Sequence, residues 1–579
     1  MSITLKQFKP YLFQAILTIF LVAAAAILGL YLPNMMSNIV NKGVVRQNID
    51  YIIQVGLKML LVSFISVLFG VLSHLTSAQI AASYAKDLRF KIFKKITDFS
   101  LTEFDSFSTA SLITRNTNDV LQIQQLSIMM MRMVIRAPIL SIGGIIMAFS
   151  INAKLSSILF ISLPLLIVGI VLLIIKTMPL FRQLQKKIDK INLVVRENIL
   201  GVRVIRAFNK EDYEEKRFNI ANLDLTKTAL TLNRINAIIF PLMMFLMNFT
   251  TIGIIAYGAN LMDANKLNIG DLMAVLQYVI QILFAFAMIS VIFTFLPRAL
   301  ASINRIDEVL AKENSIKESE SSDLSLSSLK DKEILFDNVT FYYPLSKEPV
   351  LENLTFSIPE GKTTAIIGNT GAGKSTLLYL LLRFYDVSSG QIKIGNINIK
   401  ELKQNQLRNL FGYAPQKPII FSSSIYENIK FGRQIDDSKV FEAAKIAMVN
   451  EFAEKMPEGY NSILAQGGTN LSGGQKQRIS IARAIAEKKE FYIFDDTFSA
   501  LDFKTDSKIR MEISKIASDS TLIIVSQRVA TILGAYQIIV LEDGKIAGIG
   551  NHNKLLKSCE VYQNFVHSQL SDEDIKSLR

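Results

Sequence analysis

The stretch that decides the fold of the C-terminal half is Gly368-Asn369-Thr370-Gly371-Ala372-Gly373-Lys374-Ser375-Thr376. The apolar run 364–367 before it predicts a buried strand, and the apolar run 377–382 after it predicts the start of a helix. A loop of the form G-x-x-x-x-G-K-[ST] between a strand and a helix is the pattern of a phosphate-binding P-loop. Its backbone N–H groups and the N-terminus of its helix face the phosphates. We therefore predict that these nine residues bind ATP, that Lys374 reaches the β- and γ-phosphates, and that Ser375 is a ligand of Mg²⁺.

The composition of the whole chain indicates a membrane protein. Of the 579 residues, 50% are hydrophobic, and they concentrate in the first half of the sequence. The net charge of +13 raises the question of a nucleic-acid partner, which depends on where the charges lie. The single cysteine, Cys559, excludes an intramolecular disulfide framework.

Uncharged segments long enough to cross about 30 Å of hydrocarbon identify the membrane spans. Six segments qualify, and the second is uncharged as long as His74 is not protonated: 10–41, 59–85, 137–153, 155–175, 235–262 and 272–297. The first also resembles a signal peptide, because Lys6 and Lys9 precede an apolar run with small residues. The five further spans and the uncharged continuation to Asn41 favour a retained helix.

The loops between the spans predict the orientation of the chain in the membrane. The long connections 86–136 and 176–234 hold 8 and 13 lysines and arginines, whereas the three opposite connections together hold 5. Positively charged loops stay on the cytoplasmic side. We therefore expect a multi-pass protein of the cell membrane with both termini and the P-loop half in the cytoplasm. Topology accounts for most of the positive charge, and we predict no nucleic-acid partner.

The two long loops are too long and too periodic to be irregular connectors. We expect the spans beside them to continue as helices beyond the bilayer and to turn at tips near 104–109 and 206–211. An aromatic residue beside polar residues at such a tip suits docking into a groove on another domain. An ordinary helical hairpin cap explains the same residues equally well.

The pattern changes after the last span. Residues 311–332 are charged and serine-rich, which is typical of a solvated linker. From 333 onward, short β-rich runs alternate with helices. The predicted fold class is an α-helical transmembrane domain, 1–310, with six spans extended into the cytosol, followed by an α/β P-loop nucleotide-binding domain, 333–579.

Three further stretches narrow the function. Leu471-Ser472-Gly473-Gly474-Gln475 runs into a predicted helix whose free N–H groups form a second anion site. The chain already holds phosphate on its own P-loop, so this second site makes sense if it serves a nucleotide bound to another subunit. The apolar strand 491–494 ends at Asp495, a predicted Mg²⁺ residue, and the strand 522–526 delivers Gln527 to the same edge of the sheet.

Together these motifs resemble those of an ATP-binding cassette (ABC) exporter half-transporter, and the resemblance covers nearly the whole chain. It implies that Tyr343 stacks on the adenine, although Tyr343 could also be an ordinary core residue. It implies that Gln416 links Mg²⁺ to the membrane helices and that Asp502 belongs to the D-loop. In this family each ATP lies between the P-loop of one chain and the Leu-Ser-Gly-Gly-Gln signature of the other, so a second chain is required.

Three positions depart from the family pattern: one of them is Gln466, which stands where the family usually has glutamate, and the other two lie where the family places residues that act on the γ-phosphate. Asp496 stands where the family places the glutamate that polarises the attacking water, and Gln527 stands in place of the switch histidine. One methylene fewer draws the carboxylate back by roughly 1.5 Å, where an error of 1 Å costs about 10²-fold in rate. Gln527 lacks the ring and the titratable nitrogen of histidine. A site that merely runs slower is the simpler reading of these changes.

Because both changes concern the same γ-phosphate and the signature is intact, we predict a site that hydrolyses ATP poorly. The combination resembles one subunit of the heterodimeric bacterial multidrug exporters. Its partner would be a non-identical half-transporter, and its cargo a hydrophobic or amphipathic compound. The rival readings are a homodimeric lipid or peptide exporter with two equivalent sites, and an ATP-dependent switch that uses its spans only as an anchor.

Overall fold

The computed structural model describes residues 2–318, 331–344 and 346–570, and within the helices it describes no side chain at 170, 173, 174, 236, 239, 240, 290, 291, 293 and 294. The chain forms two compact units. One consists of Met1–Thr97 and Ser108–Lys312, and the other of Asp98–Phe107 and Glu313–Arg579. Most of the predicted linker 311–332, from 319 to 330, lies outside the described residues. The domain boundaries drawn from the sequence therefore stay a prediction.

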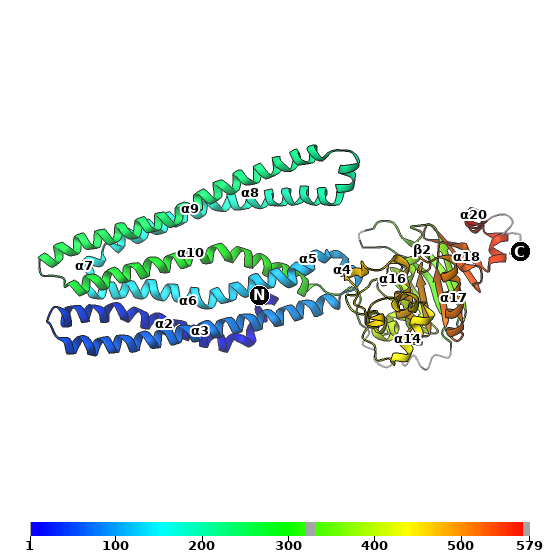
Figure 1. The fold of residues 1–579 in the computed structure, drawn as a ribbon, viewed down its shortest axis with the longest axis horizontal. Coiled ribbons are helices and arrows are strands. Elements are labelled where there is room, and N and C mark those ends of the chain that lie inside the picture. Colours follow the sequence, from blue (N-terminus) through cyan, green and yellow to red (C-terminus); the bar gives the residue numbers. More distant parts are fainter. Residues whose placement is uncertain (1, 319–330, 345, 571–579) are drawn as a thin grey trace. The chain divides into compact units, whose positions relative to one another are not determined.

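The first unit is helical throughout its described length (Figure 1). Its long helices are α2 Leu12–Asn38, α3 Ile49–Thr97, α6 Val120–Ile151, α8 Leu159–Ala207, α9 Glu211–Asp263 and α10 Ile269–Ala311. Its short helical segments are α1 Ile3–Lys6, η1 Lys9–Tyr11, η2 Ile39–Val44, α5 Thr109–Thr114, η3 Arg115–Asp119 and α7 Ala153–Ser156.

The long helices exceed the thickness of a bilayer. Helix α8 has 49 residues, which at 1.5 Å per residue gives a length of about 74 Å against about 30 Å of hydrocarbon. Continuation of the helices beyond the membrane, as the loop periodicity predicted, follows from these lengths.

Five helical segments of the described residues are long and apolar enough to span a membrane: Ile3–Val44, Ile49–Thr97, Thr109–Ile151, Pro241–Asp263 and Ile269–Ile289. Ala153–Gly169 is apolar but shorter. It covers the beginning of the predicted fourth span, 155–175, in which three side chains are not described. The count of six spans therefore stays a prediction.

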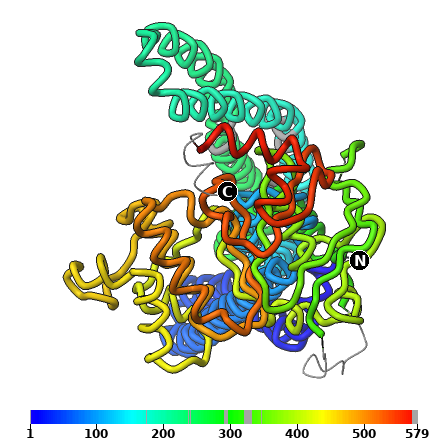
Figure 2. Tube along the Cα trace, turned by 90° about the vertical axis from the view of Figure 1, so that its right-hand side faces the viewer, coloured from blue at the N-terminus to red at the C-terminus, as the bar shows by residue number. Residues whose placement is uncertain are grey.

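Helices α8 and α9 form one long hairpin, visible as two adjacent helices in both views (Figures 1 and 2). Lys187 Nζ lies 2.6 Å from Asp224 Oδ1, and Asn198 Nδ2 donates to Glu214 Oε2 at 2.9 Å. The chain reverses at 208–210, where the predicted second tip lies, and the Phe208 side chain is 70% exposed there. This tip therefore presents an apolar ring to its surroundings.

A buried carboxylate ties η3 to α10. Asp119 is 2% exposed, accepts from Ser302 Oγ at 2.9 Å and pairs with the Arg305 guanidinium, whose Nε lies 2.8 Å away. Arg115 Nη1 forms an ion pair with Glu308 at 2.7 Å. Because the Asp119 carboxylate is buried, removal of Arg305 would leave an uncompensated negative charge there.

The second unit is an α/β structure with two sheets. Its strands are β1 Ile334–Phe341, β2 Leu351–Ile358, β3 Thr363–Gly368, β4 Ser389–Ile394, β5 Ile397–Asn398, β6 Phe411–Ala414, β7 Phe491–Asp495, β8 Thr521–Val525, β9 Gln537–Glu542 and β10 Lys545–Gly550. The antiparallel sheet has the order β2-β1-β4-β5, and the larger sheet has the order β10-β9-β3-β8-β7-β6. In the larger sheet β9, β3, β8, β7 and β6 are parallel, and β10 is antiparallel to β9.

Helices surround these sheets: α4 Leu101–Ser106, α11 Lys374–Leu381, α12 Gln404–Asn409, α13 Ile425–Lys430, α14 Asp437–Ile446, α15 Asn450–Ala453, α16 Gly473–Ile485, α17 Phe503–Ile516, α18 Val529–Ile532, α19 His552–Ser558 and α20 Glu560–Gln569. The core between the two sheets and α11 is apolar and fully buried, with Phe336 and Phe356 stacked at 4.5 Å. Central parallel strands are covered on both faces, so they read as continuous apolar runs in the sequence.

Candidate nucleotide site

Four neighbouring parallel strands bring the predicted site residues to one edge of the larger sheet. In the order β3-β8-β7-β6, the strands are followed by the P-loop, by Gln527, by Asp495 and Asp496, and by Gln416. The carboxyl ends of parallel strands meet at the same edge, where α/β sheets bind their ligands. A cavity of about 310 Å³ lies there. Its lining is Tyr343, Val350, Thr370, Gly371, Gly373, Lys374, Ser375, Thr376, Gln416, Asp495, Asp496, Val525 and Gln527.

The backbone of the P-loop requires two of its glycines. Gly373 has φ +93°, and a Cβ there would lie 2.5 Å from Leu351 Cδ2. A Cβ on Gly368 would lie 2.3 Å from the carbonyl oxygen of Leu541 on β9. A side chain at either position would displace the loop. Gly373 has a left-handed backbone, and at both glycines a Cβ would come too close to a neighbouring atom. The loop thus leads into α11, whose first residues, Lys374 to Thr376, line the cavity, so an anion there meets the N-terminus of the helix.

Lys374 is buried at the base of this loop. Its Nζ donates to the carbonyl oxygens of Gly368 and Asn369, both at 2.7 Å. Burial lowers the pKa of Lys374, while the nearby carboxylates of Asp496 and Asp495 act in the opposite direction. A buried ammonium group that donates to two carbonyl oxygens gains further from an anionic ligand such as a triphosphate.

The side chains of Ser375 and Asp495 are suited to Mg²⁺. Ser375 Oγ lies 3.3 Å from Asp495 Oδ1, and Asp495 is 2% exposed. Burial raises the pKa of Asp495 to about 6, against the lowering effect of the Ser375 hydrogen bond. A hydroxyl beside a carboxylate is a donor set of hard oxygens, which Mg²⁺ prefers, usually with water completing its shell. The residues present therefore fit a bound Mg²⁺, which would neutralise phosphate charge.

Asp496 occupies the position next to this pair with an unusual backbone. Its φ is +46°, a left-handed conformation that short Asp and Asn tolerate better than longer residues. Its N–H donates to Val525 O at 2.9 Å, and its Oδ2 accepts from Gln416 Nε2 at 3.4 Å. Burial raises the pKa of Asp496, with the Gln416 hydrogen bond and the Lys374 charge opposing it.

Tyr343 also lines the cavity. Its hydroxyl is 2.9 Å from Thr376 Oγ1, so the ring is held over the first turn of α11. Tyr385 packs edge-on against Tyr343 at 5.4 Å, and its hydroxyl donates to Asp105 Oδ2 of α4 at 2.8 Å. Burial and this bond raise the pKa of Tyr385. The segment 98–107, which contains the first part of the predicted loop tip at 104–109, thus belongs to the unit that carries the cavity.

The signature residues form a well-capped helix N-terminus apart from this cavity. Ser472 Oγ accepts from Gln475 N at 3.3 Å, and Gln475 Oε1 accepts from Ser472 N at 2.8 Å, which is a reciprocal capping box on α16. Leu471 is buried, whereas Ser472 and Gly473 are exposed, with Gly474 half-buried. This N-terminus is accessible from outside the chain.

The structure brings together most of the predicted residues and leaves others apart. Besides the lining residues, Gly368, Asn369 and Ala372 form the back of the same loop. The signature residues Leu471–Gln475 do not line the cavity, and neither does Asp502. Asp502 caps α17, accepting from Thr505 N at 3.0 Å, and this N–H lowers the pKa of Asp502.

Two contacts of the site were not predicted. Gln477 Nε2, from α16, donates to Gln416 O at 2.8 Å and so connects the signature helix to the residue after β6. Arg528 Nη2 donates to Ser499 O at 2.7 Å, and Nη1 lies 3.5 Å from Leu501 O. Arg528 follows Gln527 directly, so its nearness could be expected. Its partners are set by the tertiary fold, which no spacing in the sequence reveals.

Comparisons with known proteins agree with this architecture. A family model described as the ABC transporter transmembrane region matches residues 13–286, and one described as the ABC transporter matches residues 351–499. The chain is 35% identical over 568 residues to an uncharacterized ABC transporter ATP-binding protein of Mycobacterium tuberculosis, covering 97% of each chain. It is 34% identical over 578 residues to an uncharacterized ABC transporter ATP-binding protein of Bacillus subtilis, covering 100% of each.

A solved structure shares the fold. It is that of a bacterial Atm1-family ABC exporter with ATP bound, with a TM-score of 0.80 and 23% identity, and the match covers 97% of this chain and 99% of the other. The predicted fold class, a helical transmembrane domain followed by an α/β nucleotide-binding domain, is confirmed.

Proposed function

The chain belongs to the ABC transporter family, as an ATP-hydrolysing exporter half-transporter, and from this we propose that it is one subunit of a heterodimeric exporter of hydrophobic or amphipathic compounds, of the multidrug type. Its own ATP site hydrolyses poorly. Its signature, Leu471–Gln475, completes the productive site on a non-identical partner. The nucleotide-binding domain and both termini lie in the cytoplasm.

One observation carries the proposal: the two residues that would act on the γ-phosphate both differ from the family pattern. Asp496 and Gln527 line the same cavity as Lys374 and Ser375. Binding residues are thus retained where hydrolytic ones are changed. Lys374 and the P-loop backbone hold the triphosphate, Tyr343 stacks on the adenine, and Ser375, Asp495 and Gln416 hold Mg²⁺.

The changed residues retain binding chemistry but lose the alignment of water. The Asp496 carboxylate is shorter than that of glutamate by one methylene and is shared with Gln416 Nε2 at 3.4 Å. A displacement of roughly 1 Å reduces the rate by about 10²-fold. Gln527 donates a hydrogen bond but cannot take up a proton in the neutral pH range. ATP in this site therefore persists and keeps the two nucleotide-binding domains together.

The signature supports the second half of the proposal. The capping box of Ser472 and Gln475 shapes the N-terminus of α16, and its first residues are exposed. Oriented N–H groups at a helix N-terminus bind phosphate. A site of this kind contributes to catalysis only when a second chain supplies the nucleotide.

The experiment that tests this proposal compares two variants in the native complex, purified through a tag on this chain. Under the proposal, Ser472→Ala strongly reduces the ATPase activity of the complex, whereas Asp496→Asn leaves most of it. In a homodimer with two equivalent sites, both variants abolish activity, and that result rejects the asymmetric arrangement. Mass spectrometry of the tagged complex identifies the second chain, and recovery of this chain alone also rejects it.

A cap-loss control separates the role of Ser472 from helix stability. Loss of an N-cap costs about 0.5–2 kcal/mol wherever it occurs. Asn551 caps α19 by accepting from Lys554 N at 2.9 Å. Asn551→Ala thus removes a comparable cap without touching the signature, and we expect it to keep the ATPase activity.

A further inference from the structure

The loop that carries Gln527 is held by a side chain from the C-terminal helix. This loop, residues 526–528, connects β8 to α18. Gln569, the last residue of α20, donates from Nε2 to Gln527 O at 2.8 Å and accepts at Oε1 from Val529 N at 2.8 Å. One amide group thus binds the backbone on both sides of Arg528, at the carbonyl of Gln527 and at the N–H of Val529. The two residues are 42 positions apart in the sequence.

Helix α20 is a firm support for this contact. Tyr562 and Val566 are fully buried in a cluster with Ile367 of β3, Val540 of β9 and Val529 of α18. Residues packed in this way keep single rotamers, so the position of the helix follows that of the strands beneath it. The amide of Gln569 is therefore positioned by the same sheet that carries the P-loop.

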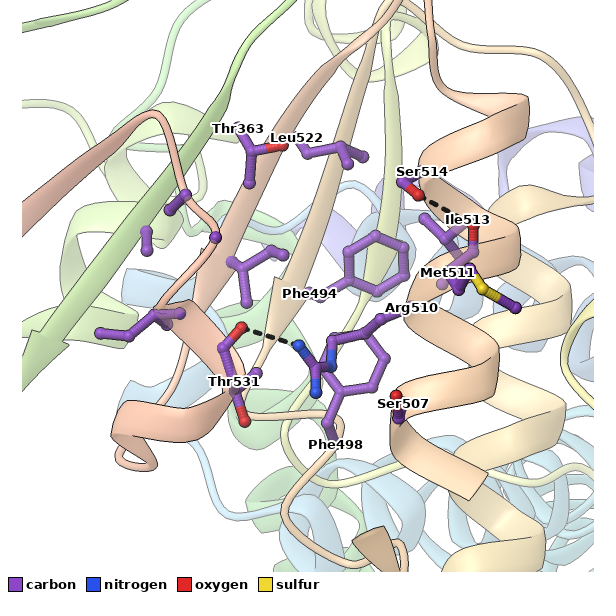
Figure 3. A pocket seen from close by; sticks show the side chains of 15 residues that line it. Thr363, Phe494, Phe498, Ser507, Arg510, Met511, Ile513, Ser514, Leu522 and Thr531 are labelled. Carbon is purple, nitrogen blue, oxygen red and sulfur yellow. Dashed lines mark hydrogen bonds between the residues drawn. The ribbon is translucent and has the colours of Figure 1, made fainter. Parts of the chain in front are cut away.

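The other end of α18 is bonded to a side chain of a different helix. Arg510 Nη1, from α17, donates to Thr531 O at 3.1 Å, as drawn in Figure 3. Asp506 braces the same guanidinium through Nε at 2.7 Å and Nη2 at 3.1 Å. Carbonyl oxygens at residues 527 and 531 thus each receive a side-chain donor from a neighbouring helix. Of these donors, Gln569 is the one bonded to the backbone of Gln527.

We propose that Gln569 is a positioning residue for Gln527. It fixes the backbone of the 526–528 loop so that the Gln527 amide points into the nucleotide cavity. The amide of Gln527 is carried on three rotatable bonds, and a fixed backbone limits the positions that this amide can reach. The inference rests on the proposed role of Gln527 at the nucleotide. It gives the last residue of α20 a positioning role in that site.

The test uses the native complex purified through a tag on this chain and measures the release of prebound radiolabelled ATP after a chase of unlabelled ATP. Gln569→Ala removes both hydrogen bonds, and we expect release to become about three- to tenfold faster. Gln569→Glu keeps the acceptor for Val529 N–H and loses the donor to Gln527 O, so we expect an intermediate rate. Gln563→Ala is the matched control, since Gln563 lies on the same helix and donates to Leu556 O at 2.8 Å.

The Gln527→Ala background separates positioning from general stability. If Gln569 acts through Gln527, Gln569→Ala adds nothing to the release rate once Gln527 is alanine. Equal acceleration in both backgrounds, or the same acceleration from Gln563→Ala, overturns the inference. If Gln527→Ala speeds release and Gln569→Ala does not, the inference alone is wrong. If Gln527→Ala leaves release unchanged, the proposed role of Gln527 fails and the inference fails with it.

Discussion

Replacement of Asp496 by glutamate tests the central premise of the proposed function. Asp496 lies beside Gln416 and Lys374 at the carboxyl edge of the sheet, with its carboxylate drawn back relative to the family residue. Asp496→Glu adds one methylene and extends the carboxylate by roughly 1.5 Å. If the retracted carboxylate limits hydrolysis, this single change increases the rate at this site.

The expected size follows from the geometry. A misplacement of about 1 Å costs about 10²-fold, and Gln527 still replaces histidine, so we expect a gain of about tenfold to 10²-fold. The new residue also has to adopt the left-handed backbone at φ +46°. That strain costs about 1–2 kcal/mol of stability in a longer residue and acts on folding rather than on the chemical step.

The assay is a single-turnover measurement of labelled phosphate released from the γ-position of ATP. The native complex is used, with the P-loop lysine of the second chain replaced so that hydrolysis there is suppressed. Asp543→Glu is the matched control, because Asp543 also has a left-handed backbone, at φ +43°, is exposed, and is not one of the residues that line the cavity. It carries the same backbone strain without a carboxylate at the nucleotide.

A release rate for Asp496→Glu no higher than that for Asp543→Glu refutes the reasoning. In that case the length of the carboxylate does not limit hydrolysis. A substantial rate in the unmodified chain, comparable with that of the second site, refutes it equally, since it shows that aspartate already places the water.

Three further predictions follow from the site. Because burial raises the pKa of Asp495 to about 6, the protonated form stabilises the nucleotide-free fold up to about pH 4, and this contribution is lost as the pH rises through about 6. Ionised Asp495 is the Mg²⁺ ligand, so the Mg²⁺-dependent part of ATP affinity should rise between pH 5 and 7, and Asp495→Asn should remove this step in a nucleotide titration. Lys374→Ala should weaken ATP binding by about 10- to 10²-fold, as expected for lost charged hydrogen bonds, in the same titration. Tyr385→Phe removes the hydrogen bond to Asp105 at 2.8 Å, and Asp105 lies in the predicted tip of the loop between two membrane spans. We therefore expect less transport per ATP hydrolysed at an unchanged ATP affinity. The exposed Tyr536→Phe is the control.

The sequence was sufficient to predict the sheet edge of the site. Apolar runs ending in Asp495 and before Gln527 predicted buried strands, and β7 and β8 are such strands. Because parallel strands align their carboxyl ends, residues after different strands meet without any sequence signal that pairs them. The P-loop motif itself is a local signal, and the structure places it directly between β3 and α11.

Contacts between elements distant in the sequence could not be predicted. The bond between Tyr385 and Asp105 joins residues 280 positions apart, and the sequence left the tip at 104–109 open between docking and simple capping. The ion pair of Asp119 with Arg305 is equally non-local, at 186 positions. Hydrophobic periodicity shows which face of an element is buried, but the partner of a polar side chain depends on the packing of the whole unit.

Under the proposed function, the two half-sites on this chain differ in quality, and this difference favours a non-identical partner. In a head-to-tail pair, each ATP meets the P-loop face of one chain and the signature of the other. Two identical copies would place the intact signature opposite the shortened Asp496 in both sites, and neither site would combine a good signature with a well-placed base. Paired with a chain that has glutamate and histidine, the Ser472 signature serves a competent site, while Asp496 and Gln527 leave ATP bound in the other. The capped and exposed start of α16 is then useful for catalysis in a way that this chain's own cavity is not.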